Sequence, residues 1–183
     1  MLAEQRMGPN RQLDPEALGD HIDRLYRAAR SLCRSREEAE DLVQETFARV
    51  LKKPRILRSD DDLGYLLRVL RNTFISTRRA AARRPQASAP PEALEFVEDA
   101  GAVQPESRLE VAELYEVISA LPTDFRDAVV AIDVVGLSHR EAARALRVRE
   151  ATITTRLHRG RQRIARVLSG EATLQREPRD RLG

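Results

Sequence analysis

The chain has 183 residues, enough for one domain or for two small ones. Aromatic residues make up only 4 % and Trp is absent, so aliphatic side chains and Ala must form any core, which favours helices packed on helices. The 32 basic and 29 acidic residues leave a net charge of +3. A single cysteine, Cys33, excludes a disulfide framework and any zinc site built from several cysteines.

The sequence contains no recognisable targeting or membrane segment. Residues 1–12 include no apolar run typical of a secretory signal. No stretch approaches the roughly 18 consecutive apolar residues that a membrane span needs. We therefore expect a soluble, cytoplasmic protein.

Opposite charges are segregated along the chain, and the near-neutral total conceals this. Residues 14–51 carry nine acids and six bases, whereas residues 63–84 contain six arginines and no acid. Residues 85–107 combine four prolines with five acids and no base, which is typical of a linker. Residues 138–167 hold nine arginines against two glutamates. The composition predicts two small domains joined by a flexible, acidic linker.

Apolar residues recur at helical spacing on both sides of this linker. The segments with this pattern are 18–32, 39–51 and 63–74 before it, and 109–118 and 125–132 after it. Pro122 suits the first turn of the last of these helices. No segment alternates for long enough to be a strand, so the sequence predicts an all-α fold.

The sharpest local signal lies in the C-terminal half. Ser138, followed three residues later by Glu141, is typical of a capping box that begins a helix. A turn at 147–149 leads into a longer helix from Glu150 to about Leu168. One face of that helix is apolar, and the opposite face carries hydroxyl groups and arginines. Arg can reach a guanine edge and Thr a phosphate or a thymine methyl, so the pattern predicts a DNA-binding helix-turn-helix.

Three blocks resemble extracytoplasmic-function (group IV) sigma factors of the sigma-70 family, in the order in which that family has them. Region 2.1–2.2 is similar to EEAEDLVQETFARVL at 37–51, and regions 2.3–2.4 are similar to LGYLLRVLRNTFISTRRAAARR at 63–84. Region 4 is similar to LPTDFRDAVVAIDVVGLSHREAARALRVREATITTRLHRGRQRI at 121–164. The resemblance implies region 2 over 12–84, a linker over 85–107, region 4 over 108–168, and flexible tails at 1–11 and 169–183.

The resemblance also implies three binding surfaces. Docking on the β′ coiled coil of core RNA polymerase is expected of Asp41, Gln44 and Glu45, and region 4 is expected on the β-flap. The opened strand of the −10 element is expected to be read by Asn72 and gripped at its phosphates by Arg68, Arg71, Arg78 and Arg79. The residues expected to contact the −35 element are Thr152, Thr154, Thr155, Arg156, His158 and Arg159.

Departures from the family pattern occur in the helix-turn-helix. Arg147 occupies a turn position that usually holds Gly, and Arg149 replaces the usual small N-cap residue. A left-handed Arg147 would cost roughly 1 kcal/mol relative to Gly, so the turn could be shaped differently. Thr154 stands where a basic residue is common, so promoter sequence cannot be copied from a relative.

No pattern indicates catalysis, a cofactor or a metal. The three histidines are far apart in sequence, and Cys33 is expected to be a small buried hydrophobe. The sequence thus predicts a non-enzymatic sigma factor whose partners are core RNA polymerase and promoter DNA. An anti-sigma factor is a further partner that the resemblance implies, although no residue identifies its site. Two alternatives stay open: a polymerase-independent helix-turn-helix regulator, and a helical adaptor that binds no DNA.

Overall fold

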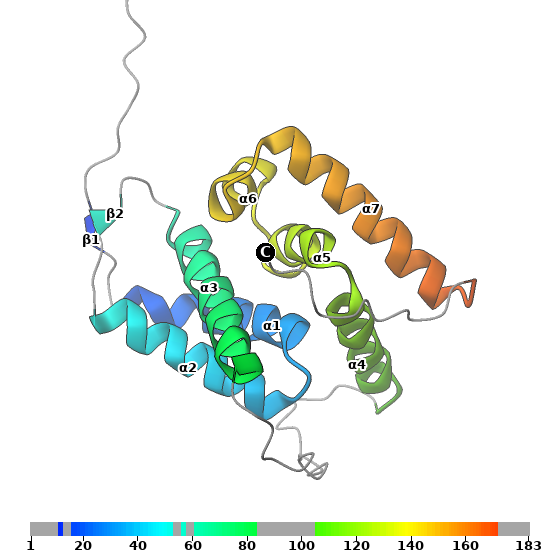
Figure 1. Ribbon diagram of the computed structural model, residues 1–183, viewed down its shortest axis with the longest axis horizontal. Coiled ribbons are helices and arrows are strands. Elements are labelled where there is room, and N and C mark those ends of the chain that lie inside the picture. Colours follow the sequence, from blue (N-terminus) through cyan, green and yellow to red (C-terminus); the bar gives the residue numbers. More distant parts are fainter. Residues whose placement is uncertain (1–10, 13–15, 53–55, 58–60, 84–104, 172–183) are drawn as a thin grey trace, which may run out of the picture.

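A computed structural model describes residues 11–12, 16–52, 56–57, 61–83 and 105–171 (Figure 1). Its longer helices are α1 (Ile22–Leu32), α2 (Arg36–Lys52), α3 (Asp62–Arg83), α4 (Pro105–Ala120), α5 (Thr123–Val129), α6 (His139–Leu146) and α7 (Glu150–Leu168). A 3₁₀-helix, Glu16–His21, precedes α1, and a π-helical segment, Val130–Val134, continues α5. The all-α prediction is confirmed. No helix among these residues is long and apolar enough to cross a lipid bilayer.

The first three helices pack around a shared apolar core. Leu25 of α1 and Leu66 and Leu70 of α3 are completely buried there, which explains the helical spacing of their segments. Asp61 ends the preceding loop by capping α3, since its Oδ1 accepts a 2.9 Å hydrogen bond from the Gly64 N–H. These contacts fix the direction in which α3 leaves the bundle.

A short β-pairing, which the sequence does not predict, accompanies this half. Strand β1 (Arg11–Gln12) runs antiparallel to β2 (Ile56–Leu57), with Arg11 opposite Leu57. Two residues are too few to show alternation, so periodicity could not reveal this pair.

The second half is built from α4 to α7. Pro122 is the N-cap residue of α5. It therefore stands one position before the first turn, whereas the sequence predicted it within that turn. The capping box of α6 is confirmed: Ser138 Oγ accepts a 3.3 Å hydrogen bond from the Glu141 N–H, and Glu141 Oε2 accepts a 2.7 Å bond from the Ser138 N–H. The Glu141 carboxylate also accepts a 2.6 Å hydrogen bond from the Ser138 hydroxyl, and this bond, followed by the one from the Ser138 N–H, lowers the pKa of Glu141. Helices α6 and α7 form the predicted helix-turn-helix.

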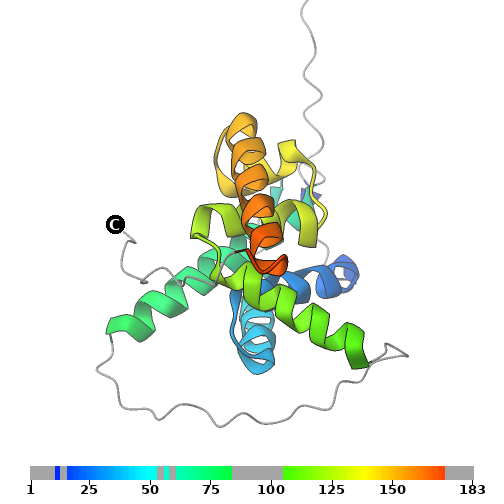
Figure 2. The ribbon, with the colours of Figure 1, turned by 90° about the vertical axis from the view of Figure 1, so that its right-hand side faces the viewer.

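The two halves pack against each other, which the sequence did not indicate. Helix α3 lies beside α6, and α1 contacts both α4 and the π-helical segment. Buried residues of both halves belong to one continuous apolar cluster. In Figure 2, α3 and α4 point to opposite sides beneath α7, so their outer ends diverge.

The linker prediction falls mostly outside the described residues. Residues 84–104 are not described, whereas 105–107 already belong to α4 and are helical. Most of both predicted tails, 1–11 and 169–183, likewise lies outside the described ranges.

Candidate functional surfaces

Helix α2 carries a polar face that is open to solvent. Asp41, Gln44 and Glu45 are all exposed on it, while Leu42 and Val43 on the opposite side are buried. Glu45 Oε1 pairs with Arg49 Nε at 2.7 Å, but both side chains are about half exposed, so the pair contributes little stability. We call these three residues the α2 docking face.

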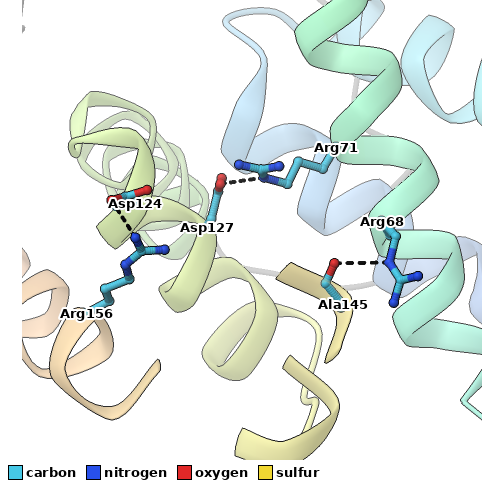
Figure 3. Close-up of polar contacts among 6 residues, drawn as sticks. All are labelled: Arg68, Arg71, Asp124, Asp127, Ala145 and Arg156. Carbon is cyan, nitrogen blue, oxygen red and sulfur yellow. Dashed lines mark hydrogen bonds and ion pairs between the residues drawn. The ribbon is translucent and has the colours of Figure 1, made fainter. Parts of the chain in front are cut away.

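The α3 residues expected at the −10 element separate into two groups. Asn72 and Arg79 are exposed, and the Arg78 guanidinium lies 5.5 Å from the centre of the Phe74 ring. Phe74 is buried, as its place in the apolar stripe predicted. Arg68 and Arg71, in contrast, are half-buried and turn toward the C-terminal half (Figure 3).

Arg71 forms an ion pair with a buried carboxylate of α5. Its Nε donates to Asp127 Oδ2 at 2.5 Å, and the Asp127 side chain is only 4 % exposed. Burial raises the pKa of Asp127, and the neighbouring Arg71 opposes that shift. A buried carboxylate requires such a partner, because an uncompensated charge away from water is costly.

Arg68 binds the C-terminal end of α6. Its Nε donates to the Ala145 carbonyl at 3.1 Å, and its Nη2 donates to the Arg144 carbonyl at 2.7 Å. The last four carbonyls of a helix have no partner within the helix and carry partial negative charge. A side chain of the first half therefore caps the first helix of the helix-turn-helix.

A third arginine of this interface, Arg126, lies on α5 and is unrelated to any sequence motif. The guanidinium of Arg126 is 5.7 Å from the centre of the Phe74 ring, and its Nη1 donates to the Ser119 carbonyl at 3.3 Å. Burial lowers the pKa of Arg126. Sequence reasoning missed both Arg126 and Asp127, because nothing along one chain distinguishes a charge that faces another domain from one that faces water.

Helix α7 presents the residues expected at the −35 element on one outer side. Thr154, Thr155, His158 and Arg159 are exposed, while Thr152 and Arg156 are half-buried. Arg156 Nη2 donates to Asp124 Oδ2 of α5 at 2.7 Å, as Figure 3 shows. The apolar side is also as predicted, with Ile153, Leu157 and Gly160 buried.

Gly160 lets α7 approach α5 closely. A Cβ atom at this position would lie 2.6 Å from Val129 Cγ2 and 3.3 Å from the Phe125 carbonyl oxygen. Beside this contact is a shallow cavity of about 660 Å³, lined by Phe125, Arg159, Gln162, Arg163, Ala165 and Arg166. The arginines there extend the basic surface of α7 toward its C-terminal end.

The turn between α6 and α7 corrects one expectation. Arg147 adopts φ 58° and ψ 44°, so the turn keeps the left-handed conformation instead of taking another shape. The Val148 N–H donates to the Ala143 carbonyl at 3.0 Å, which is the 6→1 bond of a Schellman motif, and the Arg147 N–H donates to the same carbonyl, which is the bond of the αL motif. These bonds and the packing of Val148 against the core offset the strain.

Replacing this strained residue is expected to stabilise the protein. Because Gly adopts the left-handed conformation without a Cβ clash, Arg147→Gly should raise the free energy of unfolding by about 1 kcal/mol. Urea denaturation followed by circular dichroism measures the change. An Arg147→Gly variant that is less stable than the parent would contradict the left-handed turn.

Neither a metal cluster nor a reactive thiol accompanies these surfaces. No group of His, Cys, Asp and Glu among the described residues could hold a metal ion. Cys33 is 6 % exposed, as expected of a small buried hydrophobe, and burial raises the pKa of its thiol to about 12.

Comparison with known proteins decides the family. The family model of Sigma-70 region 2 matches residues 18–84, and that of Sigma-70 region 4 matches residues 112–164. The ECF RNA polymerase sigma factor SigM of Mycobacterium tuberculosis is 34 % identical over 149 residues, covering 81 % of this chain and 73 % of the relative. The chain belongs to the ECF sigma factors of the sigma-70 family. The matched ranges place α1–α3 of this sigma factor in region 2 and most of α4–α7 in region 4.

Other relatives agree with this assignment. The ECF RNA polymerase sigma factor SigE of Mycolicibacterium smegmatis is 38 % identical over 153 residues; this sigma factor spans only 59 % of its length. Among solved structures, CnrH in complex with the cytosolic domain of CnrY has a TM-score of 0.61 at 23 % identity, covering 86 % of this chain and 88 % of that one. RpoE of Bartonella quintana, in complex with the anti-sigma factor NepR, has a TM-score of 0.64 at 23 % identity, with coverages of 86 % and 97 %. At these identities the two structures establish the fold.

Proposed function

We propose that this sigma factor binds core RNA polymerase and directs it to specific promoters for the initiation of transcription. Region 2, over 12–84, would dock on the polymerase and read the −10 element. A linker over 85–107 would connect it to region 4, over 108–168, which would read the −35 element. The observation that most supports this proposal is that both sigma-70 regions occur in order on one chain, each with an exposed polar helix face.

The α2 docking face suits a basic protein partner. Its carboxylates, Asp41 and Glu45, are exposed, so complementary charge could attract the β′ coiled coil without first burying an uncompensated group. Region 4 would occupy the β-flap. Both contacts would be made in the cytoplasm, where the polymerase acts, and the role is not enzymatic.

The two DNA surfaces differ in chemistry. On α3, Asn72 offers an amide that can hydrogen-bond the edge of an unstacked base, with Arg68, Arg71, Arg78 and Arg79 as phosphate ligands. On α7, Arg159 and His158 can reach base edges in the major groove, and Thr152, Thr154, Thr155 and Arg156 can contact phosphates or thymine methyl groups. The linker keeps the second surface at high local concentration once the first has bound.

Run-off transcription with purified core RNA polymerase over a promoter library tests the proposal. We expect specific transcripts only when this chain is present, from templates that share two short elements at a fixed spacing. A gel shift on the selected promoter, with and without core polymerase, distinguishes a sigma factor from a regulator that binds alone. Absence of any specific transcript, together with tight binding of duplex DNA by the free chain, would overturn the proposal.

An anti-sigma factor is a further proposed partner. Both solved relatives described above are complexes, CnrH with CnrY and RpoE with the anti-sigma factor NepR.

A further inference from the structure

Arg156, one of the residues expected at the −35 element, is bound to another helix. Its Nη2 donates to Asp124 Oδ2, in the first turn of α5, at 2.7 Å (Figure 3). The Arg156 side chain is only 25 % exposed, while the Asp124 side chain is 58 % exposed. Thr154 and Thr155, in contrast, donate their hydroxyl groups to carbonyls of α7 itself. The direction of the Arg156 side chain is therefore set from outside its own helix.

The position of Arg156 on α7 explains this contact. It lies three residues after Ile153 and four before Gly160, both of which are buried, so it stands at the border of the buried side. At Gly160, α7 approaches α5 so closely that an added Cβ atom would lie 3.3 Å from the carbonyl oxygen of Phe125, the neighbour of Asp124. The first turn of α5 is thereby brought beside this border, where the guanidinium of Arg156 meets the Asp124 carboxylate.

The pairing leaves most of the guanidinium free to bind a second anion. An arginine has several N–H donors in one plane, and Asp124 accepts a hydrogen bond from one nitrogen only. No other hydrogen bond from the Arg156 side chain occurs among the residues that the structure describes. Guanidinium groups bind carboxylate and phosphate oxygens with the same planar geometry. A phosphate can therefore occupy the donors that Asp124 leaves open.

Asp124 is a firm attachment point for the long arginine side chain. Its carboxylate lies in the first turn of α5, where the partial positive charge of a helix N-terminus favours an acid. A short Asp side chain has little conformational freedom to lose, whereas Arg has much. The ion pair adds little stability to the fold, because Asp124 is exposed to water. Its main effect is to restrict Arg156.

Restricting Arg156 before DNA arrives favours binding. Immobilising a long side chain at an interface lowers the affinity by a factor of about two to ten, and a side chain that is already held in place avoids this loss. The negative charge of Asp124 acts in the opposite direction, since it repels DNA. That repulsion is screened over about 8 Å at physiological salt, and for an exposed carboxylate it lowers the affinity by less than about twofold. Holding Arg156 in place is therefore the larger effect.

We infer that Asp124 is a positioning residue for the −35 contact: it holds Arg156 beside α5, with the open donors of the guanidinium directed to a phosphate of the DNA backbone. Asp124 itself acts only through Arg156. Reading of the bases is left to the exposed residues of α7, which include His158 and Arg159. The inference rests on the proposed function, because the −35 duplex is the ligand.

The first test measures binding of a fluorescent duplex by the full chain in complex with core RNA polymerase. The duplex carries the −35 element of the promoter selected by run-off transcription. Asp124→Asn should lower the affinity about fivefold, because the amide keeps the size of the side chain but loses the charge that holds Arg156. Asp124→Glu, which keeps the carboxylate, should recover most of this loss. Failure of Asp124→Glu to recover it would count against the inference.

The matched control is Asp133→Asn, which removes another ion pair between an aspartate and α7. Asp133 Oδ2 accepts a 3.0 Å hydrogen bond from Arg161 Nε, and Arg161 is not among the residues expected at the −35 element. This variant loses the same charge from region 4, so its affinity should stay within about twofold of the parent. Thermal unfolding shows whether each variant is folded. Equal losses in Asp124→Asn and Asp133→Asn would overturn the inference.

A double-mutant cycle separates positioning from general structural support. If Asp124 acts through Arg156, adding Asp124→Asn to Arg156→Gln should cause no further loss of affinity. Additive losses would mean that Asp124 acts independently of Arg156. An Asp124→Asn variant that binds the duplex as tightly as the parent, or more tightly, would likewise refute the positioning role.

The second test distinguishes a phosphate contact from a base contact at Arg156. Arg156→Gln should reduce the slope of log affinity against log salt concentration by about one. It should also weaken binding of every single-base variant of the −35 duplex by the same factor, because a phosphate contact carries no direct sequence information. A changed base preference in Arg156→Gln would overturn the assignment of this side chain to the DNA backbone.

The two proposals fail in distinguishable ways. A parent chain that gives core polymerase no preference for the −35 duplex would refute the proposed function, and the role of Asp124 with it. A parent that binds the duplex specifically, together with an Asp124→Asn variant of equal affinity, would refute the role of Asp124 alone.

Discussion

Reversing both carboxylates of the α2 docking face, by Asp41→Arg and Glu45→Arg, should abolish binding to core RNA polymerase. Both residues are exposed, so the folded chain tolerates the change. The costs are the lost Glu45–Arg49 pair and repulsions of a few tenths of a kcal/mol each, between the new side chains at 41 and 45 and between that at 45 and Arg49. At the interface, like charges facing each other cost several kcal/mol, so the affinity should fall by at least about a hundredfold. Fluorescence anisotropy of labelled chain titrated with core polymerase measures the loss.

The matched control is Asp20→Arg with Asp23→Arg, which lie outside both the α2 docking face and region 4. Both of these residues are exposed, and their reversal changes the net charge by the same amount. The control should retain near-parental affinity, because neither residue belongs to the α2 docking face. If both double variants lose affinity equally, net charge and not a specific docking face governs the interaction.

The second large effect is expected at Gly160, where α7 crosses α5. Gly160→Leu would place a branched side chain where even a Cβ atom lies 2.6 Å from Val129 Cγ2. Val is β-branched and cannot easily rotate away, so the helices must separate. We expect a loss of about 3 kcal/mol in the free energy of unfolding, at the upper end of the usual cost of overpacking. Because α7 carries the proposed −35 surface, binding of −35 duplex should fall with it.

Urea denaturation of a graded series measures this effect. Gly160→Ala gains about 1 kcal/mol in helix propensity, which offsets part of the clash of its Cβ atom. Its loss in the free energy of unfolding should therefore be smaller than that of Gly160→Leu. Gly19→Leu is the control, since Gly19 is exposed with no atom within 4 Å of the added Cβ. Parental stability of Gly160→Leu would mean that α5 and α7 are farther apart than described.

Local features of this fold were predictable from the sequence. The apolar spacing of Leu66 and Leu70 and the Ser138–Glu141 pair identified helices and a helix start, because each depends on neighbours within one turn. The exposed positions of Asp41, Gln44 and Glu45 likewise follow from helix geometry. The expectation about Arg147 was wrong for a different reason: single-residue strain was weighed without the hydrogen bonds to Ala143 that offset it.

The contact between the halves could not be predicted in this way. Arg68 and Asn72 are one helical turn apart in sequence, yet Arg68 binds region 4 and Asn72 faces solvent. That difference depends on where α6 lies, 76 residues or more along the chain. Similarly, the sequence shows Asp127 only as an acidic residue of an amphipathic helix. Its ion pair with Arg71 becomes evident only in the structure.

The Arg68 cap also affects the motion of α6. While the halves are together, the carbonyls of Arg144 and Ala145 accept hydrogen bonds from outside their own helix, which restrains its last turn. Without Arg68, these oxygens would have only water as a partner and the last turn of α6 would fray more readily. The turn that leads into α7 is therefore steadied by a side chain of region 2. Amide hydrogen exchange along 143–148 would then report how often the Arg68 cap is released.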